Sequence, residues 1–255
     1  MRALGGTIFS GVVMGTGCLT VWQLQRYQWK LDAVKEREER LSTVPASFAE
    51  LIADGLVLMY PLPASLEYRQ VECDGEFEHE SEMLVGPRSA PAGAALPASG
   101  APPGAATASG WDVITPLRCA DGRRVLVNRG WVIREQVDQL ARPTGTQPVH
   151  GVLRAGEAGN RFAVNDFARR RFVWIDLLAM AKATNSEAII IYETDAKNGG
   201  AKVGTAVATM SWPAPRPLSS FLAFYVEPST HLVYAATWAS LSFFGAIMTY
   251  ARFVR

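Results

Sequence analysis

The stretch that decides the fold is residues 3–25, ALGGTIFSGVVMGTGCLTVWQLQ, which contains no charged side chain. A helix rises about 1.5 Å per residue, so roughly 20 apolar residues cross the hydrocarbon core of a bilayer. Residues 228–251, PSTHLVYAATWASLSFFGAIMTYA, form a second stretch without Asp, Glu, Lys or Arg. The sequence therefore predicts a membrane protein with transmembrane helices at 3–25 and 228–251 and a polar middle between them.

Positive charge indicates which side of the membrane the two ends face. Arg2 precedes the first span, and Arg252 and Arg255 follow the second. Flanks enriched in Lys and Arg face the cytoplasm or matrix, so both termini are expected on that inner side. Basic residues that follow the first span argue the other way, although acidic residues are interleaved with them: Arg26, Lys30, Lys35, Arg37 and Arg40.

The segment after the first span distinguishes a retained span from a cleaved signal peptide. A signal peptide has a short apolar region and a small-residue cleavage site. Here the apolar run continues through Trp22 into the aromatic and basic residues 25–30, which are typical of an interfacial anchor. We therefore expect a retained span. Residues 30–40 are charged except at Leu31, Ala33 and Val34, so residues 26–45 are expected to be an amphipathic extension of the helix that Pro45 ends.

Composition limits the function of the middle. The formal net charge of +1 gives no basic surface for phosphates, so nucleic-acid binding is not expected. The three cysteines form no metal or redox motif, and Cys18 lies within the first span. A disulfide between Cys73 and Cys119 is one alternative in an oxidising compartment. Buried free thiols are the expected state.

The middle, residues 46–227, has the pattern of a β-rich soluble domain. Short alternating or apolar runs begin at Tyr68 and are punctuated by Gly and Pro, as in strands. Residues 89–110 are almost all Ala, Gly, Pro and Ser, so they cannot bury enough apolar surface to order themselves. They are expected to be a long hairpin insertion or a linker.

Further strands are expected after the insertion, with a turn at 120–122 between the first two. They lie at Trp111–Leu117, Val125–Val132, Val149–Arg154, Phe172–Ile175 and Glu187–Tyr192. Asp176 is a suitable N-cap for a helix over Leu177–Ala183. We therefore expect an α+β domain, mainly antiparallel β, with a barrel or sandwich arrangement.

No catalytic motif is apparent, and the protein is not expected to be an enzyme. The three histidines, His79, His150 and His231, lie in different elements. There is no paired-histidine metal motif, Ser-His-Asp spacing or phosphate-binding glycine loop.

His231 is the strongest candidate for a site, because it lies at the outer end of the second span. At helical spacing Tyr234 and Trp238 share its face, and a neutral imidazole is a common axial ligand of haem iron. The alternative is that these rings only anchor the helix at the interface. A second open question is whether Gly11-x-x-x-Gly15 packs on Ala235-x-x-x-Ala239, because small residues at this spacing allow close helix contact.

Several motifs, in this order, resemble the surfeit locus protein 1 family, the assembly factors of haem-copper cytochrome c oxidase. At the first span the motif consists of Trp22, Gln23, Arg26, Trp29 and Lys30. The middle has Leu66–Arg69, Thr115-Pro116 and the specific run Asn128, Arg129, Gly130 and Trp131. At the second span the motif is His231, Leu232, Tyr234, Thr237 and Trp238.

The resemblance implies an assembly factor for mitochondrial cytochrome c oxidase (complex IV) that acts in haem a delivery or core-subunit maturation. Its soluble domain would face the intermembrane space from the inner membrane, or the periplasm in a bacterium. The oxidase core subunits would be partners, with other respiratory-complex subunits and the lipid bilayer. His231 would be the axial ligand of haem a, beside Tyr234 and Trp238.

One segment departs from the family pattern and supports a second hypothesis. The usual Gly-Gly-Gln-Thr segment before the second span is not recognisable, and residues 212–225 are apolar and Pro-rich instead. The run 219–225, SSFLAFY, is expected either to contact a partner or membrane or to pack on its own domain. The second hypothesis is a permanent accessory subunit of the oxidase or a supercomplex, without haem of its own.

Overall fold

The computed structural model describes residues 2–55, 60–91, 109–159, 163–195, 212–224 and 226–255. The chain forms two compact units. One consists of Met1–Glu38 with Leu222–Arg255, and the other of Glu39–Phe221.

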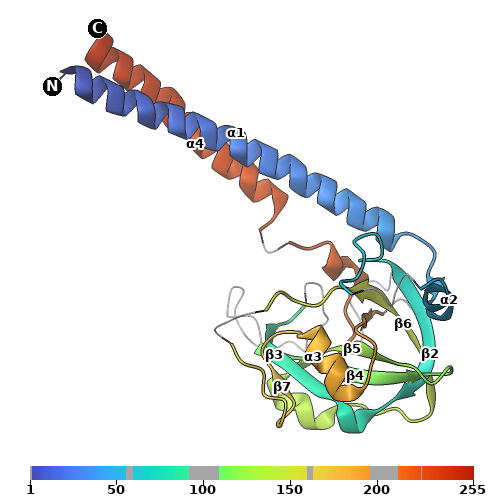
Figure 1. Ribbon diagram of the computed structural model, residues 1–255. Coiled ribbons are helices and arrows are strands. Elements are labelled where there is room, and N and C mark those ends of the chain that lie inside the picture. Colours follow the sequence, from blue (N-terminus) through green and yellow to red (C-terminus); the bar gives the residue numbers. More distant parts are fainter. Residues whose placement is uncertain (1, 56–59, 92–108, 160–162, 196–211, 225) are drawn as a thin grey trace, which may run out of the picture. The chain divides into compact units, whose positions relative to one another are not determined.

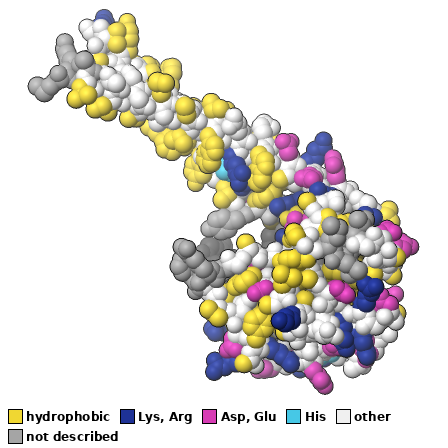
Figure 2. Space-filling view, in the orientation of Figure 1, with side chains coloured by type: hydrophobic (Ala, Val, Ile, Leu, Met, Phe, Trp, Pro, Cys, Tyr) yellow, Lys and Arg dark blue, Asp and Glu magenta, His cyan; other side chains and the backbone are white. Residues whose placement is uncertain are grey.

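The first unit is a pair of long helices, α1 (Arg2–Leu41) and α4 (Pro228–Thr249), and a π-helical turn η4 (Tyr250–Val254) follows α4. The helices lie side by side with both chain ends at the same end of the pair (Figure 1). Each is long and apolar enough to cross a membrane, which confirms the two expected apolar helices. Hydrophobic side chains cover much of their visible surface (Figure 2).

The helical extension is shorter than the expected limit at residue 45. Helix α1 ends at Leu41. The hydroxyls of Ser42 and Thr43 both donate to the carbonyl oxygen of Glu39, at 2.9 and 3.1 Å. These bonds satisfy a terminal carbonyl that lacks a partner in the helix, so the helix ends before the chain reaches Pro45.

The contact between α1 and α4 is a stripe of small and polar residues. The less exposed positions of α4 recur every three or four residues: His231, Ala235, Trp238, Ser242, Gly245 and Thr249. The Ser242 hydroxyl donates to the Val13 carbonyl oxygen at 3.0 Å. A Cβ on Gly17 would lie 3.4 Å from Ser242 Oγ, whereas one on Gly11 or Gly15 would meet nothing within 4 Å. The Gly11–Gly15 packing hypothesis is therefore wrong. The contact instead includes Gly17 of α1 and Gly245 of α4, where a Cβ would lie 3.1 Å from Val13 Cγ2.

The second unit is built on one eight-stranded sheet (Figure 1). Its strands are β1 (Ala46–Ser47), β2 (Gln70–Phe77), β3 (Met83–Ser89), β4 (Ser109–Cys119), β5 (Arg124–Ile133), β6 (Thr146–Arg154), β7 (Arg171–Phe172) and β8 (Ile190–Glu193). Its helices are α2 (Phe48–Ala53), α3 (Leu177–Thr184) and the 3-10 turns η1 (His79–Ser81), η2 (Arg134–Gln139) and η3 (Leu218–Phe221).

The strand pairing closes part of this sheet into a barrel. The order is β1-β2-β6-β8-β5-β4-β3-β7, and β2 also pairs with β4, so that β2, β6, β8, β5 and β4 form a ring. The pairs β1–β2, β3–β7 and β5–β8 are parallel, and the others are antiparallel. The expected α+β, mainly antiparallel barrel-like domain is confirmed.

Alternation along the strands separates the barrel interior from a second core. Val125 and Val127 join a cluster to which all five ring strands and α2 contribute. Leu126, between them, points to the opposite face and packs with Met180 of α3. Because successive strand residues face opposite sides, one apolar run in β5 supplies both cores.

The segment at 89–110 is a hairpin insertion and not a linker. Ser89 pairs with Ser109, and Arg88 with Gly110, so both ends of the segment belong to the β3–β4 ladder. The expected boundaries were therefore too wide, since Ser89, Ser109 and Gly110 are strand residues. Residues 92–108 lie outside the described part of the chain.

Two other strands begin or end at residues different from those expected, and beside one of them a side chain hydrogen-bonds to the backbone. The strand expected over Phe172–Ile175 is only Arg171–Phe172. Asn165 Oδ1 accepts from the Val173 N–H at 2.8 Å, and Asn165 Nδ2 donates to the Trp174 carbonyl at 3.2 Å. The strand expected over Glu187–Tyr192 is Ile190–Glu193. The predicted N-cap is present, because Asp176 accepts from the Ala179 N–H at 3.2 Å.

Candidate functional site

His231 lies in the first turn of α4 and is buried, with 9% of its surface exposed. Its Nδ1 atom is 2.7 Å from Oε1 of Gln23 on α1. An amide oxygen only accepts hydrogen bonds, so this contact requires a proton on Nδ1. The neutral ring then keeps a lone pair on Nε2, which is buried and has no hydrogen-bond partner among the described residues.

Two basic side chains lie close enough to the imidazole of His231 for their charges to act on it. Lys30 and Arg26 are the charged groups whose fields act on the His231 ring. Lys30 is buried, and its Nζ donates to the Val226 carbonyl oxygen. The guanidinium of Arg26 lies 3.9 Å from the ring centre of Trp29. The environment of His231 is therefore positive.

Rings of the 219–225 run pack within the chain's own units. In the helical unit Phe224 lies under two cations, with Lys30 Nζ at 5.2 Å and the Arg37 guanidinium carbon at 4.2 Å from its ring centre. In the barrel unit Phe221 is buried, with its ring centre 6.1 Å from that of Tyr192. Tyr225 lies outside the described residues. The alternative of packing on the chain itself holds for these two rings.

The other expected site residues of α4 differ in position. Trp238 is half-buried on the stripe that faces α1, together with His231, whereas Tyr234 is 49% exposed beside that stripe. Thr237 is exposed, and its hydroxyl donates to the Val233 carbonyl at 2.9 Å. On α1, Trp22 is 53% exposed while its neighbour Gln23 is buried. Of these residues, the structure thus brings Gln23 and His231 into contact.

The run Asn128–Trp131 forms a bulged corner of the barrel. The Gly130 N–H donates to Asn128 Oδ1 at 3.1 Å, and the β4–β5 register shifts at this point. Gly130 has a φ of +128°, and a Cβ there would lie 2.0 Å from the Ala214 carbonyl oxygen. Trp131 is fully buried, and its Nε1 donates to the Arg88 carbonyl at 3.1 Å. These contacts are those of a structural element.

Arg129 anchors the same corner to neighbouring segments. Its guanidinium donates to Glu82 at 3.4 Å and to the Ala141 carbonyl at 2.8 Å, and lies 4.9 Å from the Phe77 ring centre. Burial lowers the pKa of Arg129, and the carboxylates of Glu193 and Glu82 oppose that shift. A buried, paired guanidinium of this kind holds segments in place.

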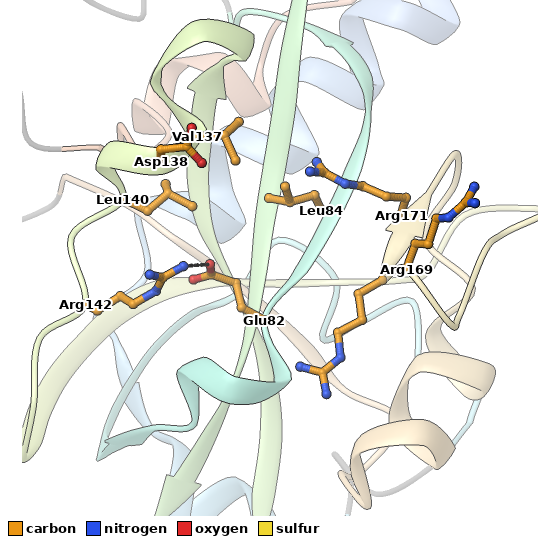
Figure 3. A pocket seen from close by; sticks show the side chains of 9 residues that line it. Glu82, Leu84, Val137, Asp138, Leu140, Arg142, Arg169 and Arg171 are labelled. Atoms are coloured by element: carbon orange, nitrogen blue, oxygen red, sulfur yellow. Dashed lines mark hydrogen bonds and ion pairs between the residues drawn. The ribbon is translucent and has the colours of Figure 1, made fainter.

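A surface recess of about 310 Å³ lies beside this corner (Figure 3). It is lined by Glu82, Leu84, Val137, Asp138, Leu140, Arg142, Arg169, Arg170 and Arg171. Arg142 forms an ion pair with Glu82 at 3.3 Å, and the side chain of Arg169 is 84% exposed. Glu82 is already bound by Arg129 and Arg142, and we assign no ligand to the recess.

The fold and the helix-pair geometry define a class: a β-barrel domain carried between two helices able to span a membrane, with a histidine buried between those helices. Comparison with known proteins narrows the class. A model of the SURF1 family matches residues 11–243. The chain belongs to the SURF1 family.

Three relatives show the extent of this similarity. The SURF1-like protein of Drosophila melanogaster is 30% identical over 255 residues, which cover 97% of this chain and 76% of the relative. Surfeit locus protein 1 of Xenopus tropicalis is 30% identical over 250 residues (96% and 74%). Surfeit locus protein 1 of Homo sapiens is 31% identical over 243 residues (93% and 73%). The family resemblance seen in the motifs is confirmed.

Sequence reasoning selected Gln23 and Lys30 as motif residues but did not pair them with His231. One signal was available. If the two helices are antiparallel, the end of the first span and the start of the second lie on the same side, so polar residues there lie at similar depth and can bond across the pair. Gln23 and His231 satisfy that condition.

Proposed function

We propose that the protein is a non-enzymatic assembly factor for cytochrome c oxidase, acting in haem a delivery or core-subunit maturation. One observation carries the proposal: a buried imidazole whose Nδ1 is bonded to Gln23 and whose Nε2 has no partner among the described residues. Family membership supports it as well.

The donor chemistry at His231 fits haem. Haem iron takes a neutral imidazole nitrogen as axial ligand, and a hydrogen bond at the other ring nitrogen orients such a ligand. His231 would hold the iron through Nε2, and within the described residues no three His, Cys, Asp or Glu side chains gather as metal ligands. Haem a, when bound, would supply the iron and two carboxylates.

Other residues would hold the group through charge and ring surfaces. Lys30 and Arg26 supply positive charge near His231, which suits the carboxylates. Trp238, half-buried on the same stripe of α4 as His231, and Tyr234, half-exposed beside that stripe, would offer flat ring faces. Gln23 would keep the imidazole oriented and its Nε2 unprotonated.

We place the protein in the mitochondrial inner membrane with the barrel unit in the intermembrane space. The basic residues Arg2, Arg252 and Arg255 at the chain ends support matrix-facing termini, and a bacterial inner membrane with the barrel in the periplasm is the alternative. Protease added to intact mitoplasts should digest the barrel unit. Protection of the barrel with digestion of the termini would contradict this topology.

A specific observation favours the second candidate, a permanent accessory subunit of the oxidase or a supercomplex without haem. Nε2 of His231 is buried, and Lys30 ties the carbonyl of Val226 to α1 beside the site. Binding of haem would therefore require the chain before α4 to move. If that movement does not occur, the imidazole is only a packing element.

Titration of the purified protein in lipid nanodiscs with haem a distinguishes the two candidates. The assembly factor predicts a haem absorption band that H231A loses, with at least a tenfold weaker affinity, while H150A behaves as wild type. His150 is a matched control because it lies on β6 and pairs with Glu72 at 3.2 Å. Absence of binding by the wild type, together with one copy per active oxidase on native gels, would support the subunit.

Gln23 variants test the orienting role separately. Q23L removes the acceptor and should weaken haem a binding by about 10–100-fold, as loss of a second-shell partner does. Q23E retains an acceptor and should restore most of the affinity. Equal affinity of Q23L and wild type would show that Gln23 has no orienting role.

A further inference from the structure

We propose that Cys73 and Cys119 are a reversible dithiol–disulfide pair that fastens the closing seam of the barrel. The two Sγ atoms are 3.3 Å apart, although 46 positions separate them in the sequence. Both thiols are free in the structure and half-buried, not fully buried as the sequence suggested. Two sulfurs at this distance are already in contact, and a rotation of the side chains brings them to the bonding distance of about 2.05 Å.

The strand geometry explains why these two cysteines meet. The seam is the β2–β4 ladder, which has only the pairs Gly75–Cys119, Glu76–Arg118 and Phe77–Leu117. A Cβ on Gly75 would lie 2.6 Å from the Arg118 carbonyl oxygen, so β2 approaches β4 more closely here than a side chain would permit. Cys73 lies two residues before Gly75 and therefore points to the same face as Cys119 does. The pair extends the seam beyond its last ladder position.

The two thiols differ in pKa and in their position in the strands. The contact with Cys119 and burial raise the pKa of Cys73, whereas the contact with Cys73 lowers the pKa of Cys119. Cys119 also ends β4 beside the turn at 120–123, where its carbonyl accepts from the Gly122 N–H at 3.0 Å. Cys119 is thus the thiol placed at a strand end beside a turn, and we assign it as the attacking group.

The oxidant is the disulfide of a second molecule, and the reaction is thiol–disulfide exchange. The Cys119 thiolate attacks that disulfide, forms a mixed disulfide and releases one thiolate. The Cys73 sulfur then loses its proton and attacks Cys119 Sγ, which releases the second thiolate. The protein loses two protons and two electrons, and the oxidant becomes a dithiol. Only the choice of cellular oxidant depends on the proposed topology.

Equilibration in glutathione redox buffers tests the pair on full-length protein in nanodiscs. Cys18 is first replaced by serine, so that two thiols remain. On oxidation, both thiols of the C18S protein should become unreactive toward an alkylating reagent in one two-electron transition. The mass should fall by two hydrogens, and no glutathione should be bound. Thiols that stay reactive under every oxidising condition, or that each carry glutathione, would overturn the proposal.

Thermal unfolding provides a second readout. A disulfide that closes a loop of this length limits the unfolded chain, so the oxidised C18S protein should melt several degrees higher than the reduced form. C18S/C73S and C18S/C119S should melt at the same temperature in both buffers, and each should take up one glutathione when oxidised. A redox-independent melting temperature of the C18S protein would show that the seam is not fastened.

Discussion

Gln23 on α1 and His231 on α4 are 208 positions apart in sequence, yet their Oε1 and Nδ1 atoms are 2.7 Å apart. Both side chains are buried, and both lie in helices able to span a membrane. Since the amide oxygen can only accept, one hydrogen bond fixes which nitrogen of the ring keeps a lone pair. The proposed haem chemistry depends on this single contact.

Gly130 should tolerate no side chain. G130A adds a Cβ 2.0 Å from the Ala214 carbonyl oxygen at a φ of +128°, so we expect a loss of about 3 kcal/mol in the free energy of unfolding of the barrel. Denaturant titration measures it. G122A is the matched control, because Gly122 also has a positive φ but its Cβ would meet nothing within 4 Å, and it should cost about 1 kcal/mol. Equal losses would contradict the proposed corner.

The helix contact should be sensitive at Gly17 and not at Gly15. In a C18S/C73S/C119S/S242C protein the new thiol lies where Ser242 bonds the Val13 carbonyl, so maleimide should label it slowly. G17L overpacks the contact by about 1–3 kcal/mol and should speed labelling tenfold or more. G15L should have no effect, since Gly15 faces open space. Faster labelling in G15L alone would indicate a different helix face.

Tyr192 should give the barrel an alkaline stability limit. Burial raises the pKa of Tyr192 to about 12, while Arg216 and Arg154 oppose the shift. Between the ordinary value near 10 and this raised value the unfolded chain releases the proton and the folded chain retains it. The free energy of unfolding should therefore fall by about 1.4 kcal/mol per pH unit over that window. Y192F should remove this slope, and an unchanged slope would exclude Tyr192 as its source.

Residues 92–108 should be dispensable for folding. The strand ends on either side pair directly at Ser89 and Ser109, and Ala90 packs against the cluster that contains Trp131, so these positions must be kept. Replacing 92–108 with a short Gly-Ser turn should leave the melting temperature within a few degrees, because loop length affects stability weakly. A large fall in melting temperature would show that the segment packs on the domain.

The sequence predicted what depends on local pattern. Uncharged length predicted both helices, and alternation with Gly and Pro predicted the strands of the barrel. The predictions from sequence were wrong or incomplete where residues distant in the sequence determine the structure. The side chain of Asn165 accepts a hydrogen bond from the Val173 N–H, and the strand ends at Phe172. The β2–β4 pairing that closes the ring has no signature in the local sequence.

At the candidate site, too, spacing along one helix was informative, whereas the rotation of that helix against its partner could not be predicted. Spacing selected His231 and Trp238 on one helix face, but Tyr234 lies beside that face because it turns away from α1. The Gly11–Gly15 pattern also matched a packing motif, yet the helix rotation places Gly17 at the contact. Rotation about a helix axis is set by the partner helix, which a single segment does not reveal.

The most direct test of the central claim is the protonation state of His231 in the protein without haem. Nitrogen NMR of ¹⁵N-histidine protein in nanodiscs, with His79 and His150 replaced, reports which ring nitrogen carries the proton. We predict a proton on Nδ1 and an unprotonated Nε2, with this preference lost in Q23L. A proton on Nε2 in the wild type would contradict the account, because the proposed ligand atom would then have no lone pair to offer.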